Sequence, residues 1–260
     1  MSDPYSVSVV WVELGDAGRI ATVTVDRAAK LNILHGALMA ELIDAFKEVS
    51  DEEDLRCVIL TGAGKKSFIG GADINAMTDL DPKTARSFIS RLHSVCQSIR
   101  DCPVPVLARV NGYCLGAGME IAAACDMRMA STTAQFGMPE VAVGIPSVIE
   151  AALLPRLIGW GKTNEILMTG KIFPAQEALD MHFIEAMVSP EQLDASLAEW
   201  TDAILNAGPF AIRSQKRLML KWESLTPDDA IQAGIDAFSD AYTTDEPHIY
   251  TQKFLNRNKT

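Results

Sequence analysis

This chain of 260 residues has no long apolar run, no excess of positive charge and no compact metal-ligand motif. A membrane-spanning helix needs roughly 20 apolar residues, and no stretch approaches that length, so we expect no membrane partner. The formal net charge of −11 argues against nucleic acid as the main partner, because phosphates favour basic surfaces. A local basic pocket could still bind an anionic small molecule. The histidines are scattered along the chain, and we predict no metal site.

The five cysteines are odd in number and include no Cys-x-x-Cys pair. Cys57, Cys114 and Cys125 lie within apolar runs, which favours buried free thiols and a reducing compartment. The first residues contain neither a basic flank with an apolar segment nor an Arg-rich transit sequence. We therefore expect a cytoplasmic protein.

Two glycine-rich segments resemble nucleotide-binding loops but have the wrong spacing. Residues 159–163 end like a phosphate-binding P-loop, yet Arg156 occupies the position of the leading glycine and no strand precedes it. We expect a turn between helices there. Gly112, Gly116 and Gly118 are spaced GxxxGxG instead of GxGxxG, which disfavours a dinucleotide cofactor.

The apolar content of 48% and the charged content of 22% are those of an ordinary globular protein. Alternating residues predict a β-hairpin with strands at 7–14 and 19–26. Short buried strands and helices then alternate, and helices dominate beyond residue 148. This order predicts an α/β fold with a helical C-terminal part. The other expected strands are 57–61, 104–110, 127–130 and 183–188, and the expected helices include 38–49, 82–99, 149–157, 163–168, 175–181, 191–205, 210–221 and 227–242.

Two glutamates, Glu120 and Glu140, each follow a glycine-rich or turn segment that leads into apolar sequence. Burying a carboxylate is expensive, so such residues are usually paired or functional. Two carboxylates in one site would form an acid/base pair, which commonly catalyses the addition or removal of water. Taken singly, each glutamate could instead be a first-turn charge at a helix start.

Two loops of small residues, within 67–74 and before Glu120, are expected to leave backbone N–H groups free. Two such donors directed at one carbonyl oxygen form an oxyanion hole, which stabilises an enolate. A helix N-terminus adds further unpaired N–H groups. The alternative is that both loops are close-packed turns without a chemical role, and spacing alone favours neither.

Four segments in order resemble the motifs of the crotonase, or enoyl-CoA hydratase/isomerase, superfamily. Residues 26–32 (DRAAKLN) resemble its first CoA-contacting segment, and residues 68–74 (FIGGADI) resemble its FxxGADI block. Residues 110–120 (VNGYCLGAGME) and 136–140 (FGMPE) resemble VNGxxxGGGxE and FGxPE. The resemblance extends over essentially the whole chain.

The resemblance implies a spiral of ββα units followed by a helical region. Residues 1–196 would form the core that carries the active site. Residues 197–260 would form a helical oligomerisation region, which builds a homotrimer or a dimer of trimers.

The resemblance also implies an acyl-CoA substrate, with no cofactor beyond the coenzyme A of that substrate. The backbone N–H groups of Ala72 and Ala117 would hold the thioester oxygen, although many members have glycine in place of Ala117. Glu120 and Glu140 would hold a water molecule, one accepting its proton and the other donating a proton to the α-carbon. The other residues implied to contact the substrate are Ala28, Lys30, Gly70, Asp73, Ile74, Phe238 and Arg257, the last two sometimes from a neighbouring subunit.

After Glu140 the chain departs from the common glycine-rich PGxGGTQRL pattern and is one residue shorter. Ser147 and Glu150 have the S-x-x-E spacing of a capping box, which predicts that Glu150 satisfies a helix start. The alternative is that both residues line the acyl pocket, with Glu150 as a third carboxylate. Either arrangement makes this wall unusual for a straight-chain enoyl-CoA enzyme.

The resemblance therefore predicts a hydro-lyase that hydrates a 2-enoyl-CoA thioester to a 3-hydroxyacyl-CoA, or runs the reverse dehydration. Members with other activities commonly keep the hole but lose or replace one glutamate, so the intact pair favours hydration. Enoyl-CoA isomerisation or hydrolysis of a cyclic acyl-CoA is the alternative, motivated by the segment around Ser147 and Glu150. A non-catalytic binding protein on the same fold is the remaining alternative.

Overall fold

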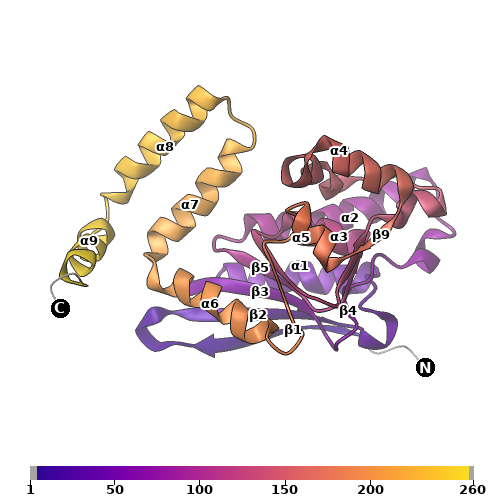
Figure 1. The fold of residues 1–260 in the computed structure, drawn as a ribbon, viewed down its shortest axis with the longest axis horizontal. Helices are drawn as coiled ribbons and strands as arrows, with labels where there is room; N and C mark the ends of the chain where they lie inside the picture. The colour runs from indigo at the N-terminus through magenta and orange to yellow at the C-terminus, as the bar shows by residue number, and fades with distance from the viewer. Residues whose placement is uncertain (1–4, 258–260) are drawn as a thin grey trace.

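A computed structural model describes residues 5–257, and its elements confirm the predicted α/β class. Figure 1 shows a long sheet with helices over one face and a helical arm that leads away from it. The sheet contains six strands in the order β1-β2-β3-β5-β7-β10. Its strands are β1 (Ser6–Glu13), β2 (Arg19–Asp26), β3 (Leu55–Gly62), β5 (Val106–Val110), β7 (Met127–Ser131) and β10 (Ala186–Val188).

The predicted hairpin is confirmed, because β1 and β2 pair antiparallel from Ser6 opposite Asp26 to Glu13 opposite Arg19. The other neighbours in this sheet pair in parallel. The strand expected at 183–188 forms only over Ala186–Val188. Phe183 and Ile184 before it are buried core residues in a turn, so their apolar character reflects packing and not a strand.

A second, four-stranded sheet was not predicted. Its strands are β4 (Ser67–Ile69), β6 (Tyr113–Leu115), β8 (Gln135–Gly137) and β9 (Ile172–Pro174), in that order. Each has three residues, too few to display a period of two. The strands β3, β5 and β7 belong to the large sheet, and the next strand along the chain in each case belongs to the small one. This repetition, with helices between the units, is the expected ββα spiral.

Helices α1 (Gly36–Ser50), α2 (Pro82–Asp101) and α3 (Ala117–Ala124) pack on one face of the large sheet (Figure 1). On that face Val58 and Ala108 belong to the main core, whereas their neighbours Cys57 and Leu107 pack on the other face against α6 (Leu193–Asn206). A parallel sheet covered on both faces explains the almost continuous apolar sequence of these strands. The predicted boundary between residues 196 and 197 falls within α6.

The glycine-rich segment at 159–163 lies inside one kinked helix, α4 (Leu154–Thr169). The kink is at Gly159, which has φ 75° and ψ 159°, so the expected helix-to-helix turn is present and a P-loop is not. The helix expected at 149–157 begins instead as a 3-10 turn, η5 (Ile149–Leu153), and becomes α-helical at Leu154.

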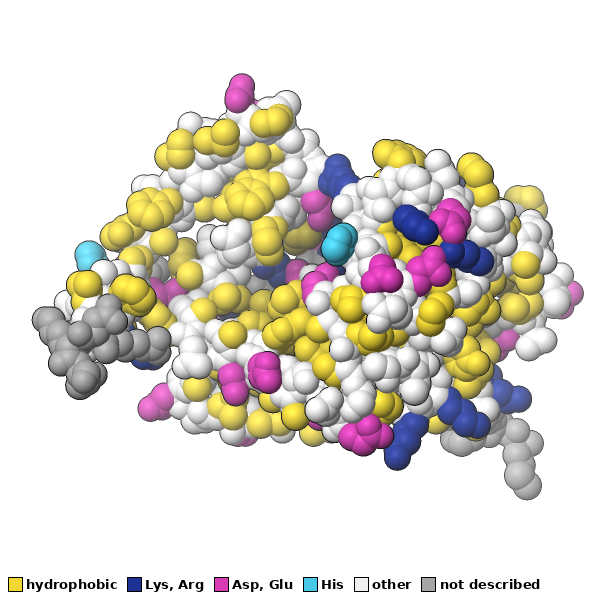
Figure 2. All heavy atoms as spheres, in the orientation of Figure 1, with side chains coloured by type: hydrophobic (Ala, Val, Ile, Leu, Met, Phe, Trp, Pro, Cys, Tyr) yellow, Lys and Arg dark blue, Asp and Glu magenta, His cyan; other side chains and the backbone are white. Residues whose placement is uncertain are grey.

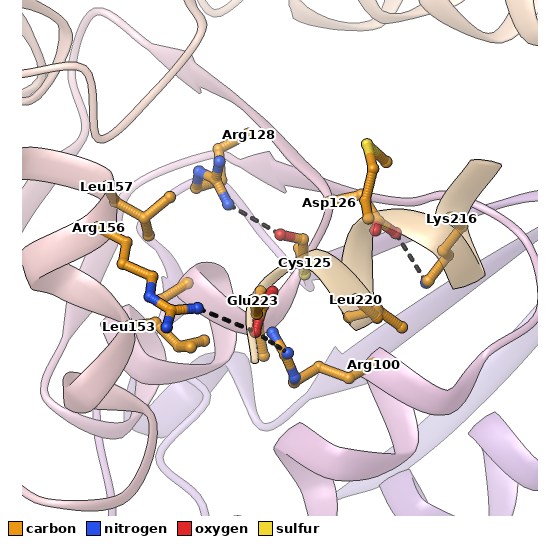
Figure 3. Close-up of a pocket in the computed structure, with 13 residues that line it drawn as sticks. Arg100, Cys125, Asp126, Arg128, Leu153, Arg156, Leu157, Lys216, Leu220 and Glu223 are labelled. Carbon is orange, nitrogen blue, oxygen red and sulfur yellow. Dashed lines mark hydrogen bonds and ion pairs between the residues drawn. The ribbon is translucent and has the colours of Figure 1, made fainter. Parts of the chain in front are cut away.

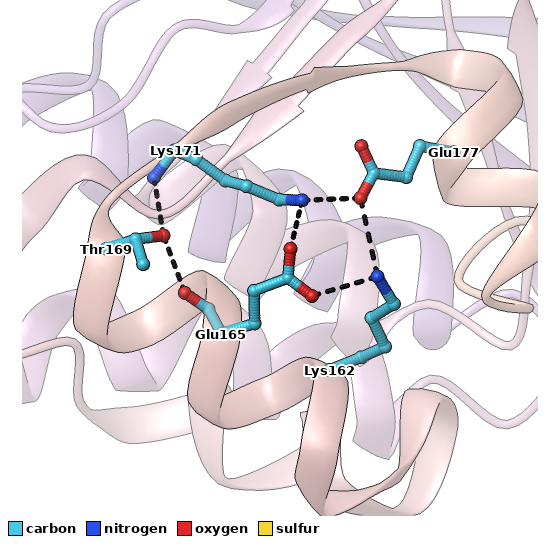
Figure 4. A network of polar contacts seen from close by, with 5 residues as sticks. All are labelled: Lys162, Glu165, Thr169, Lys171 and Glu177. Atoms are coloured by element: carbon cyan, nitrogen blue, oxygen red, sulfur yellow. Dashed lines mark hydrogen bonds and ion pairs between the residues drawn. The ribbon is translucent and has the colours of Figure 1, made fainter.

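Four side chains connect α4 to α5 (Ala175–Asp180) through a network of ion pairs (Figure 4). Lys171 Nζ lies 2.5 Å from both Glu165 Oε1 and Glu177 Oε1, and Lys162 Nζ lies 2.8 Å from Glu165 Oε2. Exposed pairs add little stability singly, but a network that fixes two elements can contribute more. The network is partly exposed, and Lys171 Nζ also lies 5.9 Å from the ring centroid of the core residue Phe173.

Helices α7 (Pro209–Trp222), α8 (Pro227–Ala241) and α9 (Glu246–Arg257) form the arm in Figure 1. The sequence predicted the first two but not α9. None of the residues of α8, all of which the structure describes, is buried. The apolar side chains of Ile231, Ile235 and Phe238 are exposed, and Figure 2 shows hydrophobic side chains gathered over the arm.

Candidate active site

The N-terminal end of α3 lies at an edge where two loops meet. β4 and β6 pair in parallel, so the loops that follow them leave the small sheet at the same end. Gly118, in the first turn of α3, has no space for a side chain, because a Cβ there would clash with the carbonyl oxygen of Ile69. The helix therefore packs directly on β4. This contact places the loops at 70–72 and 116–117 next to each other.

Glu140 reaches this edge from η4 (Pro139–Val143), the 3-10 turn after β8. A Cβ at Gly116 would lie 2.5 Å from Glu140 Oε1, and Gly116 has φ 51°. Glycine is thus needed at position 116 for both its conformation and its size. Ser147 Oγ donates a hydrogen bond to Glu140 Oε2 at 2.9 Å. Burial raises the pKa of Glu140, and the bond from Ser147 partly offsets that rise.

Glu120 is in the first turn of α3 and is 4% exposed. Burial raises its pKa to about 8, and the charges of Glu140 and Glu150 add to the rise. Backbone hydrogen bonds with Ala151 and Val148 act in the opposite direction. Glu120 is therefore a buried carboxyl that holds a proton near neutral pH, with a second carboxyl as its neighbour. Such perturbed acids cluster at functional sites.

The predicted capping box of Ser147 and Glu150 is wrong. Val148 is the N-cap residue of η5 and no side chain caps that turn. Ser147 bonds Glu140 instead, and Glu150 Oε1 lies 2.8 Å from His93 Nδ1 on α2. The S-x-x-E spacing is a local signal, whereas both partners come from other elements. Ser147 thus contacts Glu140, and Glu150 lies buried on the turn that follows.

The N–H groups of Ala72 and Ala117 are not used in the folding of the two loops. Leu34 N donates to Gly71 O at 2.9 Å and Asp73 N donates to Leu34 O at 2.8 Å. This is a parallel bridge in which the N–H of Ala72, between them, is directed away from Leu34. Ala117 is the first residue of α3, where helix N–H groups have no partner in the helix. Neither N–H donates to another described residue.

The other residues with implied substrate contacts lie along the adjoining surface. Ala28 and Lys30 are exposed in the 3-10 turn η2 (Ala28–Lys30). Gly70 N donates to Leu31 O at 2.9 Å, which joins this turn to the loop after β4. Ile74 is exposed there.

Asp73 is engaged within the fold. Arg27 Nη1 lies 3.1 Å from its Oδ2, and Asn75 N donates to its Oδ1 at 3.1 Å. Burial opposes ionisation, but these bonds outweigh it and lower the pKa of Asp73. Asp73 therefore positions its loop through its side chain.

A comparison with protein families identifies this architecture. The model of the enoyl-CoA hydratase/isomerase family matches residues 15–260. The chain belongs to this family. The resemblance to the crotonase superfamily is confirmed.

Known members of the family are similar over almost their whole length. The short-chain-enoyl-CoA hydratase of Clostridium acetobutylicum is 32% identical over 95% of each chain, and the crotonyl-CoA hydratase of Syntrophomonas wolfei is 34% identical over 93% of each. The crystal structure of an enoyl-CoA hydratase from Bacillus anthracis has a TM-score of 0.90 and 29% identity, covering 97% of this chain and 96% of its own. These relatives confirm the expected class of enzyme, a hydro-lyase of the enoyl-CoA hydratase type.

Phe238, which the family resemblance implies as a substrate contact, is not brought to this site within one chain. Phe238 is 69% exposed on α8 and packs on Tyr242, with ring centroids 5.3 Å apart, in the arm that leads away from the core (Figure 1). A role for Phe238 would require another subunit. The side chain of Arg257, the other residue implied, lies outside the described residues.

A pocket of about 180 Å³ lies at the opposite, C-terminal end of α3 (Figure 3). Its buried charges are satisfied within the fold. Arg128 donates to Ala122 O, Cys125 O and Phe183 O, and it pairs with Glu185. Lys216 Nζ bonds Ile99 O, Val104 O and Asp126 Oδ2. This pocket is distinct from the glutamate pair.

Sequence reasoning missed His93, which it treated only as a scattered histidine. The signal that sequence could offer is the spacing of His93 and Cys96, which places both on one face of the predicted helix. Their position beside Glu150 is visible only in the structure. Within residues 5–257 no helix combines the length and apolar character that a membrane span requires, and no group of three or more His, Cys, Asp or Glu could hold a metal ion.

Proposed function

We propose that this protein hydrates 2-enoyl-CoA thioesters to 3-hydroxyacyl-CoA, or runs the reverse dehydration, through an enolate. The observation that carries the proposal is the pair of Glu120 and Glu140 at the N-terminal end of α3. Burial and mutual repulsion raise the pKa of Glu120 to about 8. The pair therefore retains one proton near neutral pH.

A pair that shares one proton suits addition and elimination of water equally. In hydration the ionised carboxylate accepts a proton from water as the oxygen bonds to the β-carbon. The protonated carboxyl then gives its proton to the α-carbon, so the pair again holds one proton at the end. Dehydration reverses both transfers. Because the two groups are coupled, the proton belongs to the pair and not to one residue.

The N–H groups of Ala72 and Ala117 would receive the thioester oxygen. Their freedom from bonds to other described residues and the contact between their loops support this role. An oxyanion hole contributes most when its donors are fixed before the reaction begins. Gly71, with φ 120°, and Gly116, with φ 51°, hold the two loops in conformations that ordinary residues avoid.

Coenzyme A would lie along the exposed surface from η2 to the loop after β4. Ala28, Lys30, Gly70 and Ile74 line this surface, and Lys30 offers a cation for a phosphate. The exposed apolar side chains of α8 suit an assembly of several copies, a homotrimer or a dimer of trimers. In such an assembly Phe238 and Arg257 would reach a neighbouring site.

Glu150 is the observation that favours a second candidate. A buried carboxylate near the pair could serve isomerisation or the hydrolysis of a cyclic acyl-CoA. A turnover screen separates the possibilities, using short, long, branched and cyclic enoyl-CoA thioesters with mass spectrometry of the products. Hydration adds one water and keeps the thioester, isomerisation leaves the mass unchanged, and ring hydrolysis adds water without forming a 3-hydroxyl group. Absence of any 3-hydroxyacyl-CoA from the panel would contradict the proposal.

A further inference from the structure

Glu150 is a buried carboxylate that the proposed reaction does not use. It is 6% exposed, although the turn that carries it is next to the surface helix α2. One of its oxygens is 2.8 Å from His93 Nδ1. The other, Oε2, is buried and accepts no N–H or O–H hydrogen bond from a described residue, and the weakly donating thiol of Cys96 is the hydrogen-bonding group beside the carboxylate. Buried polar groups are almost always well satisfied, so a buried carboxylate with so few donors calls for an explanation.

The turn that carries Glu150 also holds Glu120. Backbone hydrogen bonds connect Glu120 with Val148 and Ala151, which are close to Glu150 in sequence. η5 thus lies between α2, which supplies His93, and α3, which supplies Glu120. If the pair of His93 and Glu150 were purely structural, the buried carboxyl of Glu120 would not need to lie against the same turn.

We propose that Glu150 and His93 form a positioning pair behind Glu120, in which the charge of Glu150 keeps a proton on the catalytic pair and His93 holds Glu150 in place. The inference rests on the proposed function, because it assigns the pair's proton a catalytic use. Glu150 itself need not touch the substrate.

The electrostatic surroundings support this role. The titratable groups that face Glu150 are His93 and Cys96 from α2 and Glu120 from α3, with Glu140 beyond Glu120 and Cys125 near Cys96. Burial raises the pKa of Cys96 well above its usual range, and Glu150 and Glu120 add to the rise, so this thiol stays neutral. His93 is then the group in this cluster that can carry positive charge.

His93 connects the buried cluster with solvent, because its side chain is half exposed. Histidine is the side chain whose charge changes most readily near neutral pH. A protonated His93 compensates the charge of Glu150, and a neutral one leaves that charge to act on Glu120. The two members of the positioning pair should therefore influence the catalytic pair in opposite directions.

The test compares the pH dependence of kcat/KM in the full-length protein for Glu150→Gln, His93→Gln and the control Glu199→Gln, which removes a charge from the exposed face of α6. Glu150→Gln removes the repulsion, so the alkaline limb should move to lower pH by about one unit, the effect of a nearby carboxylate charge. His93→Gln keeps a donor to Glu150 and leaves its charge uncompensated at every pH, so any shift of the limb should be to higher pH, opposite to that of Glu150→Gln. KM should change less than the limb, and Glu199→Gln should leave the profile unchanged.

Infrared titration of the protonated carboxyl band supplies a readout independent of turnover. In each variant, the pH at which that band is lost should move in the same direction as the alkaline limb of that variant. Unchanged limbs and bands in both variants would overturn the proposal, as would shifts of the same sign. If Glu150→Gln does not fold, the direction of the His93→Gln shift decides. If the wild type shows no hydratase activity but the band still shifts as expected in the variants, the proposed reaction is refuted and the positioning pair is retained.

Discussion

The two ends of α3 both contain buried charge, and they differ in how completely that charge is paired. At the C-terminal end, Arg128 and Lys216 are each 3% exposed, and each has carbonyl and carboxylate partners (Figure 3). At the N-terminal end, Glu120 is 4% exposed, and the charges that raise its pKa are those of two other carboxylates, Glu140 and Glu150. Like charges are thus held together at one end and opposite charges at the other.

The difference separates structural from functional charge. A buried ion that is fully hydrogen-bonded stabilises its surroundings once it is there, and removing its partner is strongly destabilising. Buried carboxylates that repel one another weaken the fold, so they persist where chemistry requires them. The comparison therefore predicts opposite consequences for stability and activity when each end is neutralised.

The largest effect is expected for Glu120→Gln and Glu140→Gln. Each removes a proton carrier, so kcat should fall by about 100-fold to 10,000-fold, the range for general acid–base groups. Glu120 has a pKa raised from 4.5 to about 8, so its burial weakens the fold progressively as pH rises through that window. Glu120→Gln should accordingly have an equal or higher Tm at pH 8. Binding of a substrate analogue, measured by calorimetry, should persist in both variants, and near-normal turnover would contradict the assignment.

Lys216→Met tests the other end. It removes the cation paired with Asp126, whose Oδ2 keeps the N–H of Val106, and it removes the donor to the carbonyls of Ile99 and Val104. We therefore expect a loss of about 3 kcal/mol in the free energy of unfolding. Urea denaturation measures the loss, and kcat per folded molecule should stay near the wild-type value. The exposed Lys221→Met on the same helix is the matched control. A large fall in kcat with unchanged stability would invert the comparison.

Gly116→Ala should disturb the catalytic end through shape alone. The added Cβ would lie 2.5 Å from Glu140 Oε1, and φ is 51°. Displacing a catalytic group by about 1 Å can reduce the rate about 100-fold. We expect a fall of that order in kcat, with a smaller change in stability than for Lys216→Met. Gly234→Ala, where nothing lies within 4 Å of the added Cβ, is the control and should behave like the wild type.

Most of the large sheet and the helices could be predicted from sequence, because they are long enough to show a period. The small sheet could not, since strands such as β4 and β6 have three residues each. The motif positions of Glu120 and Glu140 were predicted, but their electrostatic coupling depends on η5 and α2. The capping-box error at Ser147 and Glu150 has the same origin. Spacing describes neighbours in sequence, whereas Glu140 and His93 approach from other elements.

The alkaline side of the pH profile offers a milder test of the same end. The pair loses its one proton as pH rises through the pKa of Glu120, about 8. Wild-type kcat/KM should therefore be level between the acidic limb, where the pair takes up a second proton, and this value, and it should fall about tenfold per pH unit above it. The measurement uses one good substrate across buffers of constant ionic strength. A profile that stays level to pH 10 would show that no proton on this pair is required.

Ser147→Ala should have the smallest effect, on the acidic side. The hydroxyl donates to Glu140 Oε2 at 2.9 Å and lowers the pKa of that carboxyl. Without it the pKa of Glu140 rises, so the pair takes up a second proton at higher pH and the acidic limb moves upward. We expect less than about one unit, the size of one neutral hydrogen bond. Ser147→Thr keeps the hydroxyl and should restore the wild-type limb, and Ser87→Ala on α2 controls for loss of an exposed hydroxyl. An unmoved acidic limb in Ser147→Ala would mean that Ser147 only packs against Glu140, and that the burial of the carboxylates alone sets the difference between the two ends of α3.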